Sequence, residues 1–94
     1  MILGYRDART ERFVRGQRVK AFEPFRQQAE NRLARLEAAT SLQELTVLRG
    51  NRLEKLGGDR KGQWSMRIND QWRICFNWDE GAPGARDVEI VDYH

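Results

Sequence analysis

The stretch that decides the fold is QWSMRINDQWRICFNW, residues 63–78. Apolar residues occupy every second position on both sides of its centre: Trp64, Met66, Ile68, Trp72, Ile74, Phe76 and Trp78. This alternation is typical of β-strands that bury one face. The three polar residues between the two runs are typical of a turn. The stretch therefore predicts a β-hairpin.

The length of the turn determines which residues face each other across the hairpin. A two-residue turn would pair Arg67 with Trp72 and mix polar with apolar side chains on one face. A three-residue turn, 69–71, instead pairs Ile68 with Trp72 and keeps the apolar side chains together. We therefore predict the three-residue turn, which places Arg67 directly opposite Arg73 on the other face.

Two arginines in directly opposite positions repel each other and destabilise a sheet. Their presence suggests that an anion belongs between Arg67 and Arg73. Arginine is suited to this role because its planar guanidinium group binds phosphate through two parallel hydrogen bonds. The competing interpretation is that both long side chains simply extend into water.

The first half of the chain has a helical pattern. Asp7 is a suitable N-cap for a helix over about residues 8–15 that ends at Gly16. Pro24 fits the first turn of a second helix, in which apolar residues recur at spacings of three and four. These residues are Phe22, Phe25, Ala29, Leu33 and Leu36. The pattern predicts an apolar stripe that packs on a flat surface.

Further strands are expected on both sides of the hairpin in the sequence. The segment 2–5 is compatible with a short first strand and 52–56 with a second, while 88–93 alternates again after a glycine-rich turn. Helices followed by consecutive strands predict an α+β fold, with N-terminal helices packed on one face of a small antiparallel β-sheet. We expect residues 1–94 to form a single domain.

The composition is that of a globular protein with a basic surface. Of the 94 residues, 39% are apolar and 33% are charged, and the formal net charge is +3. Residues 48–78 alone carry 7 cations against 3 carboxylates, and most cations of the chain are arginine. An arginine-rich stretch of this kind predicts nucleic-acid binding, although the same composition also suits a well-solvated surface.

Several classes of protein are not expected. No apolar run has the length of a signal peptide or a membrane span, so we expect a cytoplasmic protein without membrane contact. One histidine and one cysteine are too few for a zinc site, and no nucleotide-binding motif is present, so we expect neither a metal nor a cofactor. Cys75 cannot form an internal disulfide, and a Cys–His nucleophile pair has no supporting motif.

The end of the chain offers acid–base chemistry. His94 is the only histidine, and its unperturbed pKa lies near neutrality. Together with Glu54, Asp92, Tyr93 and the two arginines, it fits metal-free cleavage of RNA. That reaction needs a base for the 2′-hydroxyl, an acid for the leaving 5′-oxygen and cations around the phosphorus. An aromatic ring such as that of Tyr93 can also stack on an unpaired base.

Four runs of the sequence, 51–56, 58–65, 67–74 and 88–94, closely resemble the HigB toxins of the RelE/ParE superfamily. The resemblance spans essentially the whole chain. It implies a RelE/ParE-like fold and a toxin of a type II toxin–antitoxin system, an endoribonuclease that cleaves mRNA on the ribosome and inhibits translation. It also implies neutralisation by a HigA-like helix-turn-helix antitoxin, through which the toxin would meet operator DNA only indirectly.

The resemblance also implies roles for individual residues. The catalytic end of the family maps onto Asp92, Tyr93 and His94, and its basic residues map onto Arg60, Lys61, Arg67 and Arg73. We therefore expect Arg60, Lys61 and Arg67 to bind RNA and Arg73 to take part in catalysis.

One departure from the family affects the acid–base roles. Some HigB members have a histidine where this chain has Glu54 and a lysine where it has Gly57, so their assignment cannot be copied. We expect Glu54 or Tyr93 to act as the base, His94 as the general acid and Asp92 as the residue that orients it.

The main alternative is a non-catalytic toxin that binds another target, as the gyrase-directed ParE branch of the superfamily does. The terminal Tyr93 and His94 favour the nuclease, because a protein that only binds has no need of a titratable end. The competing interpretation of His94 is a chain end that happens to be histidine.

Overall fold

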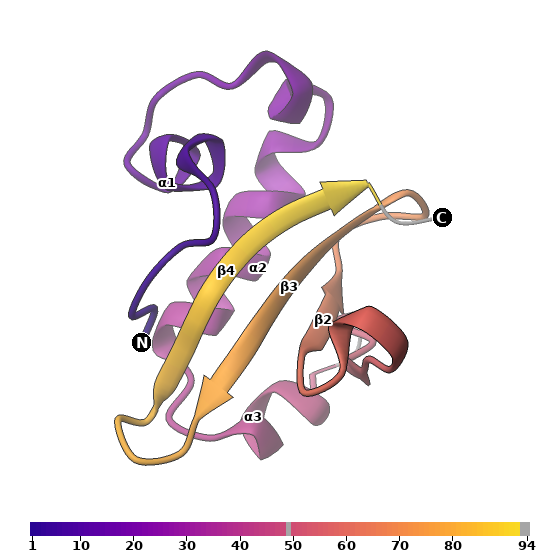
Figure 1. Cartoon of the computed structure of the whole chain (residues 1–94). Coiled ribbons are helices and arrows are strands. Elements are labelled where there is room, and N and C mark those ends of the chain that lie inside the picture. Colours follow the sequence, from indigo (N-terminus) through magenta and orange to yellow (C-terminus); the bar gives the residue numbers. More distant parts are fainter. Residues whose placement is uncertain (49, 93–94) are drawn as a thin grey trace.

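A computed structural model describes residues 1–48 and 50–92 and combines helices with an antiparallel sheet (Figure 1). The helices are α1 (Ala8–Val14), the 3₁₀ helix η1 (Lys20–Phe25), α2 (Arg26–Ala38), α3 (Leu42–Thr46) and the 3₁₀ helix η2 (Gly58–Arg60). The strands are β1 (Glu54–Lys55), β2 (Trp64–Arg67), β3 (Trp72–Asp79) and β4 (Gly84–Asp92), and they lie in that order in the sheet. The predicted α+β fold is confirmed.

The β2–β3 hairpin has the predicted register. The pairs are Trp64 with Phe76, Ser65 with Cys75, Met66 with Ile74, and Arg67 with Arg73. The backbone N–H of Ile68 donates to the carbonyl of Trp72 at 2.9 Å and closes the three-residue turn. Within the turn, the side-chain oxygen of Asn69 accepts from the backbone N–H groups of Gln71 and Trp72, both at 2.8 Å. Asn69 therefore selects the turn length by satisfying its backbone donors.

The apolar stripe of the first half packs on one face of the sheet. Phe22, Phe25, Ala29, Leu33 and Leu36 are all buried, as are Met66, Ile68, Ile74, Phe76 and Ile90 of the sheet segment. The ring of Trp72 lies 5.0 Å from that of Phe25 and 5.6 Å from that of Phe22, measured between centroids. Figure 1 shows α2 running behind the sheet. The predicted packing of the helices on one face is confirmed.

The helix boundaries follow the predicted caps with one difference. Asp7 accepts a hydrogen bond from the backbone N–H of Thr10 at 2.9 Å, as expected of an N-cap. Pro24, however, lies inside η1, and α2 begins only after it. A 3₁₀ helix has three residues per turn, so it places Phe22 and Phe25 on the same face and buries both rings.

The last strand begins at Gly84, four residues before the predicted start at Val88. Asp87 has a φ of +54°, and the β3–β4 register shifts between Cys75 and Asn77. This bulge allows Ala85 and Val88, an odd number of positions apart, to be buried on the same side. The bulge interrupts the alternation, which is why the sequence pattern missed the first half of the strand.

The segment 2–5 is not a strand, contrary to the expectation from its composition. It forms isolated parallel bridges between Ile2 and Ala85 and between Tyr5 and Val88. The backbone N–H of Leu3 donates to the carbonyl of Ala85 at 2.7 Å, so the segment covers the outer edge of β4. The bulge in β4 spaces the two bridges and prevents a regular ladder. Only Glu54–Lys55 of the expected strand at 52–56 pairs with β2.

Replacing Gly84 with alanine tests how closely the N-terminal segment packs on β4. An added β-carbon at Gly84 would lie 2.7 Å from the carbonyl oxygen of Met1 and 2.8 Å from Cγ of Leu3. We expect Gly84→Ala to lower the free energy of unfolding by about 1–3 kcal/mol, the usual cost of overpacking, in urea titrations. Gly4→Ala is the control, because nothing lies within 4 Å of its added β-carbon. Equal effects of the two changes would contradict this packing.

Candidate functional site

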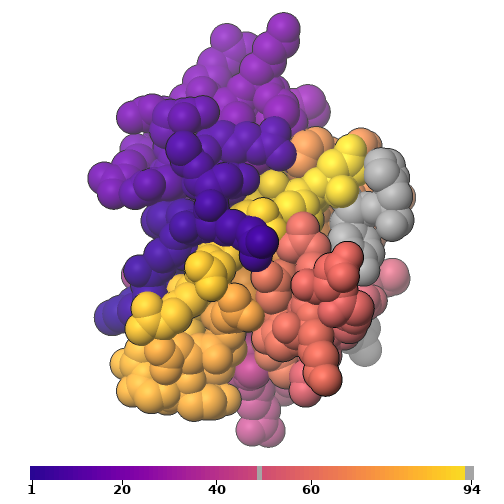
Figure 2. Space-filling view, viewed as in Figure 1, coloured from indigo at the N-terminus to yellow at the C-terminus, as the bar shows by residue number. Residues whose placement is uncertain are grey.

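The resemblance implies a catalytic surface on the open face of the sheet, and the face opposite α2 does carry the polar side chains, but the middle of this face is closed to solvent. Ser65, Cys75 and Glu89 are buried on this face. Figure 2 shows the N-terminal segment, in indigo, lying across β4, with the region around residue 60 approaching it from the other side. The middle is covered because Arg6 and Arg60 reach over the face and pair with Glu89. The described residues predicted to act in catalysis therefore have to be sought at the end of the sheet near the 69–71 turn.

Arg73 is the most extensively bonded arginine at this end. Its Nε donates to Oγ of Ser65 at 2.8 Å, and its Nη2 donates to the carbonyl of Arg52 at 2.8 Å. The same Nη2 lies 3.9 Å from a carboxylate oxygen of Glu54. The β1–β2 register positions these groups, because Glu54 lies opposite Ser65. The structure thus brings together Arg73 and Glu54, two of the residues predicted to act in catalysis.

Arg67 lies opposite Arg73 in the ladder but bonds to a different partner. Its guanidinium group pairs with the carboxylate of Asp70 in the adjacent turn, and its carbonyl accepts from Nε of Arg32 at 3.1 Å. Separate partners thus offset the repulsion between the two arginines within the protein itself. The register by itself therefore does not require an anion between Arg67 and Arg73.

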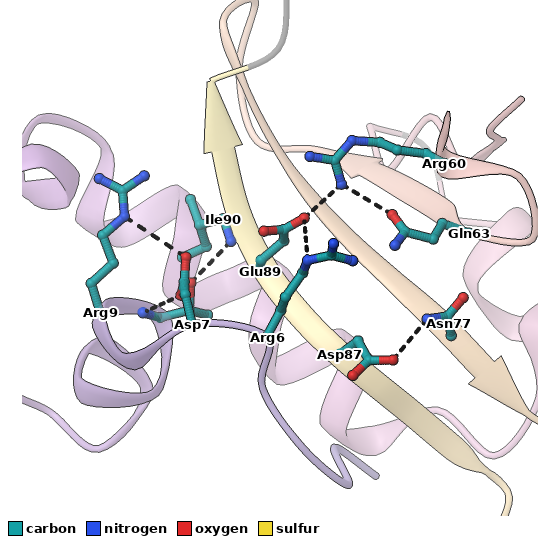
Figure 3. A network of polar contacts seen from close by, with 10 residues as sticks. Arg6, Asp7, Arg9, Arg60, Gln63, Asn77, Asp87, Glu89 and Ile90 are labelled. Atoms are coloured by element: carbon teal, nitrogen blue, oxygen red, sulfur yellow. Dashed lines mark hydrogen bonds and ion pairs between the residues drawn. The ribbon is translucent and has the colours of Figure 1, made fainter. Parts of the chain in front are cut away.

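Arg60 and Lys61, the two basic residues of the glycine-rich loop 57–63, have different surroundings. Nη1 of Arg60 donates to Oε1 of Glu89 at 2.6 Å and to Oε1 of Gln63 at 3.1 Å (Figure 3). Lys61 is exposed. Arg60 therefore faces the sheet, whereas Lys61 faces solvent, where RNA could reach it.

The described part of the chain end lies beside the same turn. Asp92 pairs with Trp72 in the ladder, and its carboxylate accepts from Nε2 of Gln71 at 2.9 Å. Tyr93 and His94 lie outside the described residues. Gln71 belongs to the turn that also holds the partner of Arg67, so Asp92 and Arg67 lie at the same end of the sheet.

Two residues of the site carry no signal in the sequence. Arg52 has a φ of +42°, an uncommon left-handed conformation that presents its carbonyl oxygen to Arg73. Ser65 fixes the other side of the same guanidinium group. Strict alternation placed Ser65 on the polar face, but nothing in the sequence indicated that it would bond to Arg73.

The arrangement suits stabilisation of a phosphate and transfer of a proton. Fixed guanidinium groups stabilise negative charge that develops at phosphorus, and they need no reorganisation when they are already held by the protein. The Glu54 side chain is 56% exposed, so a substrate hydroxyl can reach it. Within residues 1–48 and 50–92, no group of three or more His, Cys, Asp or Glu could hold a metal ion. No helix in these ranges is both long and apolar enough to cross a membrane.

A hollow of about 450 Å³ on the helical side has the opposite character. It lies between α1 and α2, and its lining includes Tyr5, Phe13 and Leu33 together with the carboxylates Glu30 and Glu37. Burial raises the pKa of Tyr5, and the nearby Glu37 carboxylate acts in the same direction. An apolar hollow with two carboxylates repels phosphate, so it is a poor site for RNA.

The buried cysteine is expected to be unreactive. Cys75 is fully buried, and burial raises the pKa of its thiol, whereas a nucleophilic cysteine needs a lowered pKa. At pH 8 we expect a disulfide reagent to modify the native protein at least about 100-fold more slowly than the protein in guanidinium chloride, because reaction requires local opening. Similar rates in the two states would show that the thiol is accessible and would reopen the question of a cysteine nucleophile.

Comparisons with known proteins agree on one group. Residues 4–94 match the HigB-like toxin family, described as RelE-like toxin of type II toxin–antitoxin system HigB. The toxin HigB-1 of Vibrio cholerae serotype O1 is 35% identical over 86 residues, which cover 87% of this chain and 88% of that protein. Endoribonuclease HigB of Proteus vulgaris is 36% identical over 64 residues, 68% of this chain and 66% of that protein.

A solved structure shows the same fold. The heterotetrameric YoeB–YefM toxin–antitoxin complex from Staphylococcus aureus contains a chain that superposes with a TM-score of 0.61. The alignment covers 100% of this chain and 98% of that chain, with 18% sequence identity. At this identity the likeness concerns the fold alone.

Proposed function

The chain belongs to the HigB-like family of RelE-type toxins from type II toxin–antitoxin systems, and we propose that it is an endoribonuclease that cleaves mRNA on the ribosome and so inhibits translation. A relative from Proteus vulgaris carries the name endoribonuclease. In this reaction the 2′-hydroxyl would lose its proton and its oxygen would attack phosphorus to give a 2′,3′-cyclic phosphate, while the bond from phosphorus to the 5′-oxygen breaks and that oxygen leaves as a hydroxyl group.

The observation that carries this proposal is the cluster of Arg73, Glu54 and Ser65 beside Arg67. In the proposed reaction, Arg67 and Arg73 bind the phosphate and stabilise the charge that develops on it. Glu54 accepts the proton of the 2′-hydroxyl, because it combines exposure to solvent with a position beside the guanidinium group of Arg73. Tyr93 remains the alternative base.

The chain end supplies the remaining roles in the proposal. His94 donates a proton to the leaving 5′-oxygen, Asp92 orients the imidazole ring, and Tyr93 stacks on a base of the RNA. Support for these roles comes from the residue types and from the position of Asp92 next to the 69–71 turn. Lys61 extends the positive surface toward the RNA backbone.

The proposal includes specific partners. Membership in a toxin–antitoxin family implies an antitoxin, as in the structural match to a toxin–antitoxin complex. We propose a HigA-like antitoxin with a helix-turn-helix domain, which would bring the toxin to operator DNA indirectly. The ribosome and its mRNA would be the targets, which places the proposed activity in the cytoplasm.

Induced expression followed by mapping of mRNA 5′ ends tests the proposed function. We expect new 5′ ends inside translated reading frames, dependent on active translation and absent when the antitoxin is co-expressed. Growth arrest with intact transcripts and stalled replication would instead indicate a non-catalytic toxin directed at gyrase.

Arg73 gives a direct test of the phosphate-binding role. We expect Arg73→Ala to lower mRNA cleavage about 100-fold or more, the scale of a lost electrostatic stabiliser. It should also lower the free energy of unfolding by about 1–2 kcal/mol, because hydrogen bonds to Ser65 and Arg52 are lost. Arg73→Lys should recover only part of the activity, because lysine keeps the positive charge but lacks the planar guanidinium group that binds phosphate through two hydrogen bonds.

Arg86→Ala is the matched control, because Arg86 is an exposed arginine of β4 whose partner, Asp79, lies at the other end of the sheet. We expect it to cleave like the parent in the same ribosome assay. If both Arg73 variants kept full toxicity, Arg73 would have no role in binding the phosphate.

Removal of His94 tests the proposed general acid. The variant ending at Tyr93 should keep its thermal unfolding midpoint and its affinity for the antitoxin. Its rate of mRNA cleavage should fall by about 100-fold or more, the contribution of a general acid. Cleavage within a few-fold of the parent, at equal protein concentration, would assign the proton transfer to another group.

A further inference from the structure

Glu89 lies where three segments of the chain meet. Its carboxylate is 2.6 Å from Nη1 of Arg60 and 3.8 Å from Nε of Arg6, and its side chain is only 10% exposed (Figure 3). It projects from β4 on the polar face and lies opposite the buried Cys75. A carboxylate so little exposed is held by its charged partners, because the loss of hydration must be offset by ion pairs and hydrogen bonds.

The loop 57–63 is closed by its own backbone. The N–H of Leu56 donates to the carbonyl of Gln63 at 2.8 Å, and the N–H of Lys61 donates to the carbonyl of Gly58 at 3.1 Å. Gly58 and Gly62 have φ values of +60° and +93°, conformations that glycine adopts readily. The bond from Leu56 continues the β1–β2 pairing at the base of the loop, and the other bond shapes its tip. The side chain of Arg60 adds a link from the tip of the loop to β4 through Glu89.

We propose that Glu89 is a positioning residue of the RNA site, which holds the 57–63 loop against the sheet through Arg60 and thereby fixes Lys61 at the RNA backbone. The proposal rests on the proposed function and revises one expectation from the sequence. Arg60, expected to bind RNA directly, links the loop to β4, and Lys61 makes the contact.

The geometry explains how such a link acts on cleavage. Arg60 and Lys61 are adjacent, so the direction of the Lys61 side chain depends on how the Arg60 backbone is held. A displacement of about 1 Å in a positioned group can cost on the order of 100-fold in rate. Glu89→Gln keeps the size of the side chain and an acceptor oxygen, but it removes the charge that makes the bond to Arg60 strong. The change therefore loosens the loop without opening a cavity.

The test places Glu89→Gln in the parent and in a Lys61→Gln background and compares mRNA cleavage on ribosomes. In the parent we expect a loss of at least about tenfold, mainly as a higher KM, because the contact with RNA is weakened. In the Lys61→Gln background the same change should have little effect, because the group that Glu89 positions is already gone. An equal loss in both backgrounds would mean that Glu89 only stabilises the fold, and it would overturn the proposal.

Arg6→Gln provides the matched control. Arg6 touches the same carboxylate, but its side chain is 55% exposed and belongs to the N-terminal segment, so the change leaves the loop attached. We expect cleavage by this variant to match the parent. If Arg6→Gln lowered mRNA cleavage as much as Glu89→Gln does, the link between Glu89 and the loop would be contradicted. Both losses would then come from the changed charge around the Glu89 carboxylate.

Hydrogen exchange gives a readout that needs no RNA cleavage. The amides of Lys61 and Gln63 are bonded within the loop, and we expect them to exchange faster in Glu89→Gln than in the parent or in Arg6→Gln. If the parent fails to cleave mRNA, the proposed function fails, while the exchange data still decide whether Glu89 anchors the loop. If the amides of Lys61 and Gln63 exchanged at the same rate in Glu89→Gln as in the parent, Glu89 would not hold the loop, and the proposal would be overturned.

Discussion

The register of the β2–β3 hairpin is the constraint on which the rest of the structure depends. The side-chain bonds of Asn69 fix a three-residue turn, and this turn pairs Arg67 with Arg73. A shift of one residue would move every side chain of one strand to the other face. The same register therefore places Met66 and Ile74 in the apolar core that α2 shares and gathers the charged groups on the opposite side.

The polar face serves both stability and the proposed chemistry, the first in its middle and the second at the end near the 69–71 turn. In its middle, Glu89 joins Arg6 and Arg60 and closes the face over Cys75. At the end near the turn, Arg73 is held by neutral oxygens of Ser65 and Arg52, with the Glu54 carboxylate farther away. A guanidinium group that is held in place before the substrate arrives can stabilise the negative charge of a phosphate without further reorganisation.

The sequence predicted those features that depend on local patterns. The apolar stripe from Phe22 to Leu36, the N-cap at Asp7 and the hairpin register are local, and all were confirmed. The bulge at Asp87 and the left-handed conformation of Arg52 were missed, because each depends on contacts with distant segments. For the same reason the pairing of Arg60 with Glu89 was missed, while the role of Arg60 in RNA binding stays untested. The roles of Tyr93 and His94 stay predictions from the sequence, since both lie outside the described residues.

The central claim is that RNA phosphate binds at the Arg67–Arg73 end of the polar face. The most direct measurement is an NMR titration with a short RNA whose 2′-hydroxyl groups are methylated, so that it binds without being cleaved. The account predicts that the side-chain Nε–H signals of Arg73 and Arg67 shift, while that of Arg86 and the amides lining the hollow between α1 and α2 stay in place. Shifts confined to that hollow, with unchanged Arg73 and Arg67 signals, would contradict it.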